Sequence, residues 1–178
     1  YDLASGDLIW EHSGLSRNVI PSPVAANGVV YAMSGFQGYF LYAIRLGKTG
    51  DLSDSDSVLW KHTKSTPYVP SPLLVDDKLY FLSSNSEVLS CFDAKTGQPL
   101  IDAERVPGLK GMYSSPIAAS GRIYLASQNG STTVLKVSDK LEVLATNQLD
   151  ESFDASPVAV GNELFLRGHK HLYCLAEK

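Results

Sequence analysis

The sequence predicts an all-β fold, a β-propeller of four-stranded antiparallel blades, with about four blades in the 178 residues. Short runs rich in Val, Leu, Ile, Tyr and Phe alternate with turn residues, as strands do. No segment keeps the 3.6-residue apolar period of a helix. Units of about 40 to 50 residues that each hold four short strands are typical of propeller blades. A Ser-Pro pair precedes an aromatic residue by a fixed spacing four times, starting at Ser22, Ser71, Ser115 and Ser156.

Each unit is expected to repeat the same strands in the same order. The first strand begins at the Ser-Pro pair, and the second carries the aromatic residue after a turn such as Asn27-Gly28. A third apolar run follows, and a fourth strand closes the unit after a tight turn. The expected strands are 22–26, 29–34, 40–45 and 57–63; 71–75, 78–83, 88–93 and 99–103; 115–119, 122–127, 133–138 and 141–147; and 156–160, 163–167 and 171–176.

These strands divide the chain into repeat units. Residues 1–12 are expected to form an outer strand or clasp. An alternative is that residues 7–12 supply the missing outer strand of the fourth unit and protect its exposed edge. The expected units are 13–63 for the first blade, 64–103 for the second, 104–147 for the third and 148–178 for an incomplete fourth.

Composition excludes several classes of protein. With 44% hydrophobic and 19% charged residues, the chain is too apolar to be disordered, and it has no apolar run that could span a membrane. A net charge of −4 with no Lys/Arg stripe argues against nucleic-acid binding. Cys91 and Cys174 are too few for a disulfide scaffold. They occupy equivalent places on third strands, so we expect both to be reduced, buried and packed like small apolar residues.

A turn after a third strand, followed by an aromatic or apolar residue, also recurs. The turns and the residues that follow them are 2–6 with Trp10, 48–50 with Trp60, and 93–97 with Ile101. These motifs and the Leu-Tyr-Ala-Ile strand at 41–44 resemble the pyrroloquinoline-quinone-like (PQQ-like) propeller repeat, Ala-x-Asp-x-x-Thr-Gly-x-x-x-Trp. The third unit departs from this pattern, with only Ser-Asp-Lys at 138–140.

The resemblance carries expectations about size and setting. Propellers of this family are rings of seven or eight blades, so four blades are about half of one. Tyr1-Asp2 aligns with Phe92-Asp93 at the end of a third strand, so we expect the sequence to be a C-terminal half of a longer protein. The family includes quinoprotein dehydrogenases and the propeller lipoprotein of the bacterial outer-membrane assembly machinery. Similarity to the latter implies an extracytoplasmic location, periplasmic or secreted.

The family's quinone site does not match these residues. That site is expected to use adjacent cysteines, a tryptophan floor, and carboxylate and amide ligands for calcium. Cys91 and Cys174 are far apart in the sequence, and Trp10 and Trp60 stand at repeat-equivalent places on outer strands, where they predict packing between blades. We therefore predict no catalytic residue, no bound cofactor and no metal site.

Three other motifs have structural and functional interpretations. His169 and His171 could form half a zinc site, but a hairpin is the simpler interpretation because zinc needs three or four ligands. The acidic run 51–57 could attract calcium, but it lacks the glycine and the glutamate of an EF-hand loop and fits a solvated insertion. His12 and His62 each follow a tryptophan by two residues, which indicates a shared structural role.

The candidate binding surface is the set of loops that a propeller gathers on one face. The loops before each Ser-Pro strand and between second and third strands should share this face, and they vary while the strands repeat. The candidate residues are Arg17, Asn18, Tyr68, Lys110, Met112, Tyr113, Phe153 and Asp154.

The main functional hypothesis is a non-catalytic scaffold whose loops bind a protein partner or another ligand. One alternative is half of a quinone-dependent dehydrogenase whose cofactor ligands lie outside this chain. Another is a carbohydrate-binding propeller with Tyr68, Tyr113 and Phe153 as stacking platforms. We also expect two copies to pair as a homodimer that completes an eight-blade ring.

Overall fold

The computed structural model describes residues 1–176 and contains strands and turns without helices in that range. None of the described segments is a helix that could cross a membrane. Residues 177 and 178, the end of the expected fourth unit, lie outside the described range. The strands are β1 (Trp10–Glu11), β2 (Val24–Ala26), β3 (Val29–Ser34), β4 (Phe40–Arg45), β5 (Gly50–Asp51), β6 (Val58–His62), β7 (Leu73–Val75), β8 (Lys78–Leu82), β9 (Val88–Asp93), β10 (Pro99–Arg105), β11 (Ile117–Ala119), β12 (Arg122–Ala126), β13 (Ser131–Lys136), β14 (Val143–Gln148), β15 (Val158–Val160), β16 (Glu163–Arg167) and β17 (Leu172–Ala176).

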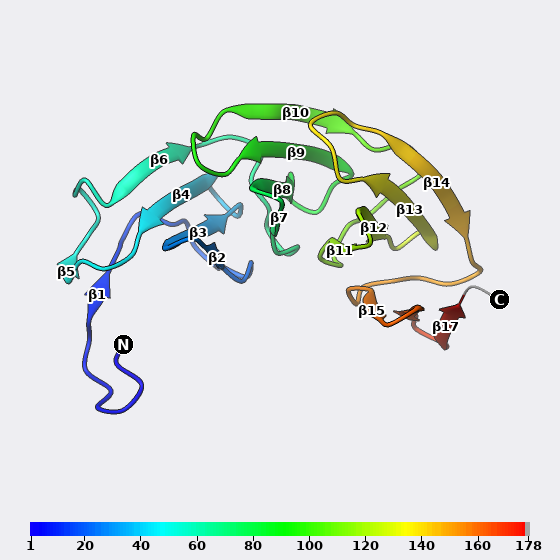
Figure 1. Cartoon of the computed structure of the whole chain (residues 1–178). Coiled ribbons are helices and arrows are strands. Elements are labelled where there is room, and N and C mark those ends of the chain that lie inside the picture. Colours follow the sequence, from blue (N-terminus) through cyan, green and yellow to red (C-terminus); the bar gives the residue numbers. More distant parts are fainter. Residues whose placement is uncertain (177–178) are drawn as a thin grey trace.

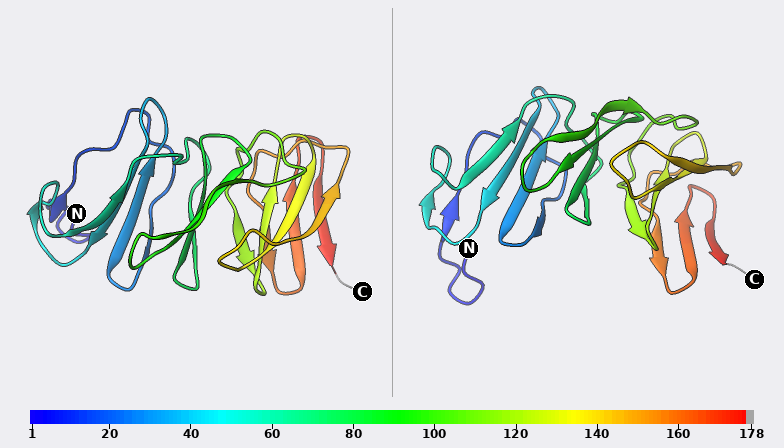
Figure 2. Two further views of the ribbon diagram at one scale, coloured as in Figure 1. Left: turned by 90° about the horizontal axis from the view of Figure 1, so that it is seen from above. Right: turned by 45° about the horizontal axis from the view of Figure 1, so that its top comes forward.

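The strands form a partial β-propeller. Three antiparallel sheets have four strands each, in the orders β2-β3-β4-β6, β7-β8-β9-β10 and β11-β12-β13-β14, and a fourth has β15-β16-β17. The sheets follow an arc, with the first strand of each sheet on the inside and β6, β10 and β14 on the outside (Figure 1). Figure 2 shows the sheets side by side in chain order. The predicted fold class is confirmed.

In all four sheets, the repeated aromatic residue of the second strand pairs with equivalent residues of the first and third strands. Tyr31 pairs with Val24 on one side and Ala43 on the other, and Phe165 pairs with Val158 and Cys174. First strands begin after the Ser-Pro pair rather than at it, because proline has no N–H to donate to a ladder. The expected strand at 22–26, for example, is observed as β2 from Val24.

The N-terminal strand does not close the fourth sheet of its own chain. β1 instead pairs in parallel with β5, with Trp10 opposite Gly50 and Glu11 opposite Asp51. Gly50 N–H donates to the Ile9 carbonyl over 2.9 Å. β1 and β17 lie at opposite ends of the arc (Figure 1), so within one chain the clasp alternative is wrong.

The core consists of clusters between neighbouring sheets rather than a single centre. One cluster joins the first and second sheets, another the second and third, and a smaller one the third and fourth. Fully buried members include Met33 and Phe81 in the first, Leu89 and Ile123 in the second, and Phe153 in the third. Each blade is therefore stabilised mainly by the faces of its neighbours, as in other repeat proteins.

Trp60 packs between blades, as the sequence predicts. Its indole Nε1–H donates to the Ala94 carbonyl over 3.1 Å, and its ring lies on Gly97 in the turn of the second sheet. The Tyr31 hydroxyl donates to the same carbonyl over 2.9 Å. The Tyr80 hydroxyl binds the Ser138 carbonyl at 2.6 Å in the next interface. Each blade thus holds the turn that follows the third strand of the next blade.

The two cysteines are free, but only one is buried. Cys91 lies in the core between the second and third sheets, where burial raises the pKa of its thiol to about 12. Cys174 is exposed, so its predicted burial is wrong. The two positions are equivalent in the repeat. They differ because no further blade within the described chain covers the face of the fourth sheet that carries Cys174.

Candidate functional site

Loops of two kinds meet on one face in all four units. The loop before each first strand, here called the leading loop, hydrogen-bonds to the loop between the second and third strands. The contacts are Ser16 N to Ser34 Oγ at 2.9 Å, Tyr68 N to Ser84 O at 3.2 Å, Gln128 N to Gly111 O at 3.0 Å and His169 N to Ser152 O at 3.2 Å. These hydrogen bonds, three between backbone groups and one to the Ser34 hydroxyl, hold the loop face in shape.

The Ser-Pro serines link neighbouring blades on the inner side of the arc. Ser22 N–H donates to Ser71 Oγ at 3.0 Å, Ser71 N–H to Ser115 Oγ at 2.9 Å, and Ser115 N–H to Ser156 Oγ at 2.9 Å. These hydrogen bonds between blades explain why a serine precedes each proline. The hydroxyl accepts a bond from the preceding blade while the amide donates to the next one.

An aromatic pair lies on the loop face of the first two blades. The rings of Phe36 and Tyr68 are stacked with centroids 4.8 Å apart and planes 25° from parallel. The Asn18 side-chain amide donates to the Tyr68 hydroxyl over 2.6 Å. Val19 and Ile20 are 46% and 44% exposed in the leading loop that carries Asn18. The pair is therefore a fixed aromatic surface next to exposed aliphatic residues.

The other predicted loop residues divide into exposed and buried ones. Tyr113 is 42% exposed, and Arg17, Lys110 and Asp154 are also exposed. These four, with Asn18 and Tyr68, remain candidates for a binding surface.

Met112 and Phe153 are core residues, which corrects their assignment to that surface. Both are 0% exposed. Phe153 packs with Ala126 and Leu166, so it offers no stacking platform for a sugar. The sequence does not separate Met112 and Phe153 from Val19 and Tyr68, which stand at the same position four residues before the Ser-Pro proline but are exposed and half-buried, respectively.

Three polar side chains are linked by hydrogen bonds on the loop face of the third and fourth blades, and the sequence alone did not predict this group. Gln128 Nε2 donates to Asp154 Oδ1 over 2.7 Å, and His169 Nε2 lies 2.8 Å from Asp154 Oδ2. The bonds from His169 and then Gln128 lower the pKa of Asp154 below its ordinary value. Because these side chains come from three separate loops, only the fold brings them together.

Glu151 fixes the hairpin loop of the fourth blade. Its side chain is 1% exposed, and its carboxylate accepts bonds from four backbone N–H groups. The bond from Ser152 comes first among the causes that lower the pKa of Glu151 to about 2. The donors and distances are Ser152 at 3.0 Å, His169 at 3.1 Å, Lys170 at 3.0 Å and His171 at 3.2 Å.

The histidines and the acidic run take part in local packing. His169 contacts Asp154, whereas His171 lies beside Tyr173 and Glu151, so the two imidazoles have different partners. Within residues 1–176, no group of three His, Cys, Asp or Glu side chains is arranged to hold a metal ion. The run 51–57 is less solvated than expected, since Leu52 is 2% exposed.

Comparison with known families identifies the repeat. A family model described as Outer membrane protein assembly factor BamB matches residues 1–102, more than half of the sequence. The chain belongs to this BamB family. No curated protein sequence matches the chain.

Solved structures agree on the fold of this BamB family member. BamB from Moraxella catarrhalis is 17% identical with a TM-score of 0.61, and the match covers 84% of this chain and 43% of that one. The designed Ika4 protein is 11% identical with a TM-score of 0.68, covering 96% and 98%. A quinohemoprotein alcohol dehydrogenase from Pseudomonas putida HK5 is 15% identical with a TM-score of 0.66, covering 91% and 30%. The chain thus spans less than half of the BamB structure it matches.

The quinone group of the related dehydrogenases does not fit the residues of this BamB family member. Trp60 donates its indole N–H to the Ala94 carbonyl in the turn after β9, and Trp10 lies on β1, which pairs with β5. Cys91 and Cys174 stand on different sheets, one buried and one exposed. No step of a quinone reaction can be assigned to these side chains.

Proposed function

We propose that the chain is a non-catalytic propeller scaffold that binds a protein segment on its loop face. We place its repeat units at 13–63, 64–103, 104–147 and 148–178. The observation that carries the proposal is the fixed aromatic pair of Phe36 and Tyr68. Phe36 is 37% exposed although the loops around it are hydrogen-bonded, so its apolar surface is not a product of disorder. Aromatic side chains held rigidly on a surface bind partners at low entropic cost.

The family indicates the kind of partner. The matching family model is described as an outer membrane protein assembly factor, and outer-membrane barrels consist of strands with alternating apolar and polar residues. An extended segment of that pattern could place its apolar side chains on the Phe36–Tyr68 pair and on Tyr113. The location that follows is extracytoplasmic, where such proteins are assembled.

Binding can be measured with a fluorescein-labelled peptide of about ten residues that has the alternating pattern of one barrel strand. We expect saturable binding by anisotropy. Tyr68→Ala should weaken it about tenfold, because the variant removes the stacked ring. Leu144→Ala is the control, since Leu144 is 51% exposed on the outer strand β14, away from the loop face. Equal affinity of the Tyr68→Ala and unmodified proteins would contradict the proposal.

The dehydrogenase alternative rests on the shared fold. It is tested by an absorbance titration of the protein with pyrroloquinoline quinone and calcium ions. We expect no saturable spectral change, because the two tryptophans are engaged in packing and the cysteines lie on different sheets. A change that saturates at one quinone per chain would show a cofactor site and overturn the non-catalytic assignment.

A further inference from the structure

Each leading loop of the first three blades carries one basic residue and no acidic residue. These basic residues are Arg17 in the loop 13–23, Lys64 in the loop 63–72 and Lys110 in the loop 106–116. All three are exposed, and within residues 1–176 none of their side chains forms an ion pair. The leading loop of the fourth blade instead has three acidic residues and no basic one, so this feature is confined to the first three blades.

Acidic residues are scarce on the loop face of the same three blades. Their loops between second and third strands contain one carboxylate, that of Glu87, and it pairs with Arg105. With the end of β10 included, which adds Glu104 beside Arg105, this surface has four cations and two carboxylates. The whole chain has a net charge of −4, so the loop face of the first three blades differs from the chain in the sign of its charge.

The turns at the opposite ends of the strands have the reverse character. Asp76 and Asp77 form the hairpin turn between β7 and β8, and Asp93 ends β9. The run 51–57, between β4 and β6, adds three aspartates. Positive and negative charge are therefore separated between the two faces of the arc, and the loop face is the one that attracts acidic groups.

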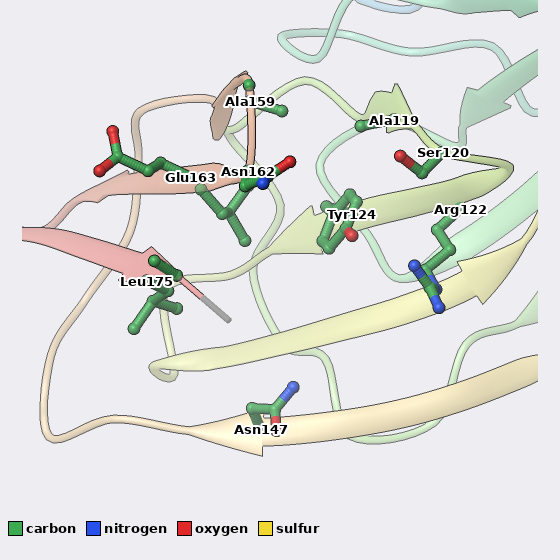
Figure 3. A pocket seen from close by; sticks show the side chains of 12 residues that line it. Ala119, Ser120, Arg122, Tyr124, Asn147, Ala159, Asn162, Glu163 and Leu175 are labelled. Carbon is green, nitrogen blue, oxygen red and sulfur yellow. The ribbon is translucent and has the colours of Figure 1, made fainter. Parts of the chain in front are cut away.

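The groove between the third and fourth sheets belongs to the turn end of the strands. It encloses about 600 Å³ and includes Ser120 and Asn162, which lie in hairpin turns between first and second strands (Figure 3). Arg122 and Glu163 give the groove charges of both signs. The groove is therefore separate from the basic loop face in position and in charge.

Hydrogen bonds between neighbouring blades hold the basic loops in place. The Thr66 hydroxyl donates to the Ser34 carbonyl over 2.6 Å, and Met112 N–H donates to the Asn85 carbonyl over 2.9 Å. Val69 N–H donates to Asn85 Oδ1 over 3.1 Å. The leading loops of the second and third blades are thus bonded to their own blade and to the preceding one. Their backbones are preorganised, which lowers the entropic cost of binding a partner.

The basic residues lie beside the aromatic surface of the loop face. Arg17 directly precedes Asn18, whose side-chain amide donates to the Tyr68 hydroxyl. Lys110 stands three residues before Tyr113, which is 42% exposed. The same loops therefore offer apolar contact area and free positive charge.

We propose that the segment bound on the loop face is acidic. It is an extended stretch whose carboxylates contact Arg17, Lys64 and Lys110 while its apolar side chains lie on Phe36 and Tyr68. This inference rests on the proposed function and adds the chemical class of the partner. Exposed ion pairs are individually weak, so the three cations contribute to recognition together rather than singly.

Three fluorescein-labelled peptides of about ten residues test the charge preference. They share the apolar positions of the alternating pattern, and their polar positions hold glutamate, serine or lysine. At low ionic strength, the glutamate peptide should bind about tenfold more tightly than the serine peptide, and the lysine peptide more weakly than both. At about 0.5 M salt, the difference between the glutamate and serine peptides should fall to about twofold, because salt screens exposed charges.

Charge reversals on the loop face identify the residues involved. Arg17→Glu and Lys110→Glu should each weaken binding of the glutamate peptide about fivefold and change binding of the serine peptide less than about twofold. The loss should appear in the association rate, whereas Tyr68→Ala should raise the dissociation rate. Lys140→Glu is the matched control, because Lys140 is exposed in the turn between β13 and β14, at the opposite end of the strands.

The outcomes separate this inference from the proposed function. Equal affinities for the glutamate and serine peptides, with both weakened by Tyr68→Ala, would overturn the acidic partner and leave the loop-face function standing. An effect of Lys140→Glu as large as those of the loop variants would show a dependence on net charge alone and would also overturn it. Displacement of the glutamate peptide by phosphatidylglycerol vesicles would assign the surface to lipid instead. Binding of none of the three peptides would contradict both proposals.

Discussion

Trp60→Ala is expected to lower the free energy of unfolding by about 3 kcal/mol, near the lower end of the range for large aromatic truncations. The substitution removes the bond from the indole Nε1–H to the Ala94 carbonyl and leaves a space above Gly97. It also removes a ring that packs against Tyr31 and Phe92, with centroids 5.9 and 6.4 Å away. The effect is large because Trp60 joins two blades and not only two strands of one blade.

Equilibrium denaturation in urea gives the measurement, and Trp60→Phe is the matched control. The phenylalanine keeps an aromatic ring over the turn but has no N–H group, so the loss of one net hydrogen bond should cost about 1 kcal/mol. Equal losses for Trp60→Ala and Trp60→Phe would contradict the packing role.

Gly97 gives an independent check of the same contact. A Cβ atom at Gly97 would lie 2.6 Å from Cδ2 of Trp60, and its φ of +72° is strained for other residues. Gly97→Ala should therefore destabilise the protein more in the presence of Trp60 than in the Trp60→Ala background. The strain that remains in the second background is about 1 kcal/mol. Additive effects of the two substitutions would mean that the ring and the turn do not interact.

Much of this architecture could be predicted from the sequence because it repeats. Spacing located the strands and the packing role of Trp60, since each is set by contacts that recur between every pair of blades. The pairing of β1 with β5 could not be predicted in this way, because β5 ends at Asp51, where an insertion without an equivalent in the other units begins.

The errors at individual residues have two causes. Met112 and Phe153 stand in variable loops, but their side chains enter the core, so loop position alone did not determine their exposure. Cys174 shares its repeat position with Cys91 and differs in its neighbours. The hydrogen bonds that link Gln128, Asp154 and His169 depend on contacts between separate loops, which no short-range sequence pattern predicts.

Gly168→Ala is expected to destabilise the fourth blade by about 2 kcal/mol, the cost of forcing an extra group into a packed site. A Cβ atom at Gly168 would overlap the Glu151 carboxyl group and push it away from its four N–H donors. The hairpin loop at 168–171 would then lose the group that satisfies its backbone. Hydrogen exchange of the His169, Lys170 and His171 amides should rise more than that of β8 or β12, which localises the effect. A uniform rise over all sheets would contradict the local role of Glu151.

The acid stability of the protein should depend on the same carboxylate. The pKa of Glu151 is about 2 in the folded protein, below its ordinary value of 4.5. A carboxyl group with a lowered folded-state pKa stabilises the protein fully above its ordinary pKa, and this contribution is lost as the pH falls through 4.5 toward 2. Glu151→Gln should therefore be less stable than the unmodified protein at neutral pH. The difference between their urea midpoints should shrink through that window.

This comparison isolates Glu151 from Asp154, whose pKa is also lowered but which both proteins retain. Glu104→Gln, at an exposed position of β10, removes the same charge and serves as the control. A difference between the urea midpoints of the Glu151→Gln and unmodified proteins that stays constant from neutral to acidic pH would mean that the amide replaces the carboxylate fully. That result is not expected, because an amide has one acceptor oxygen and its NH₂ group would face backbone N–H donors.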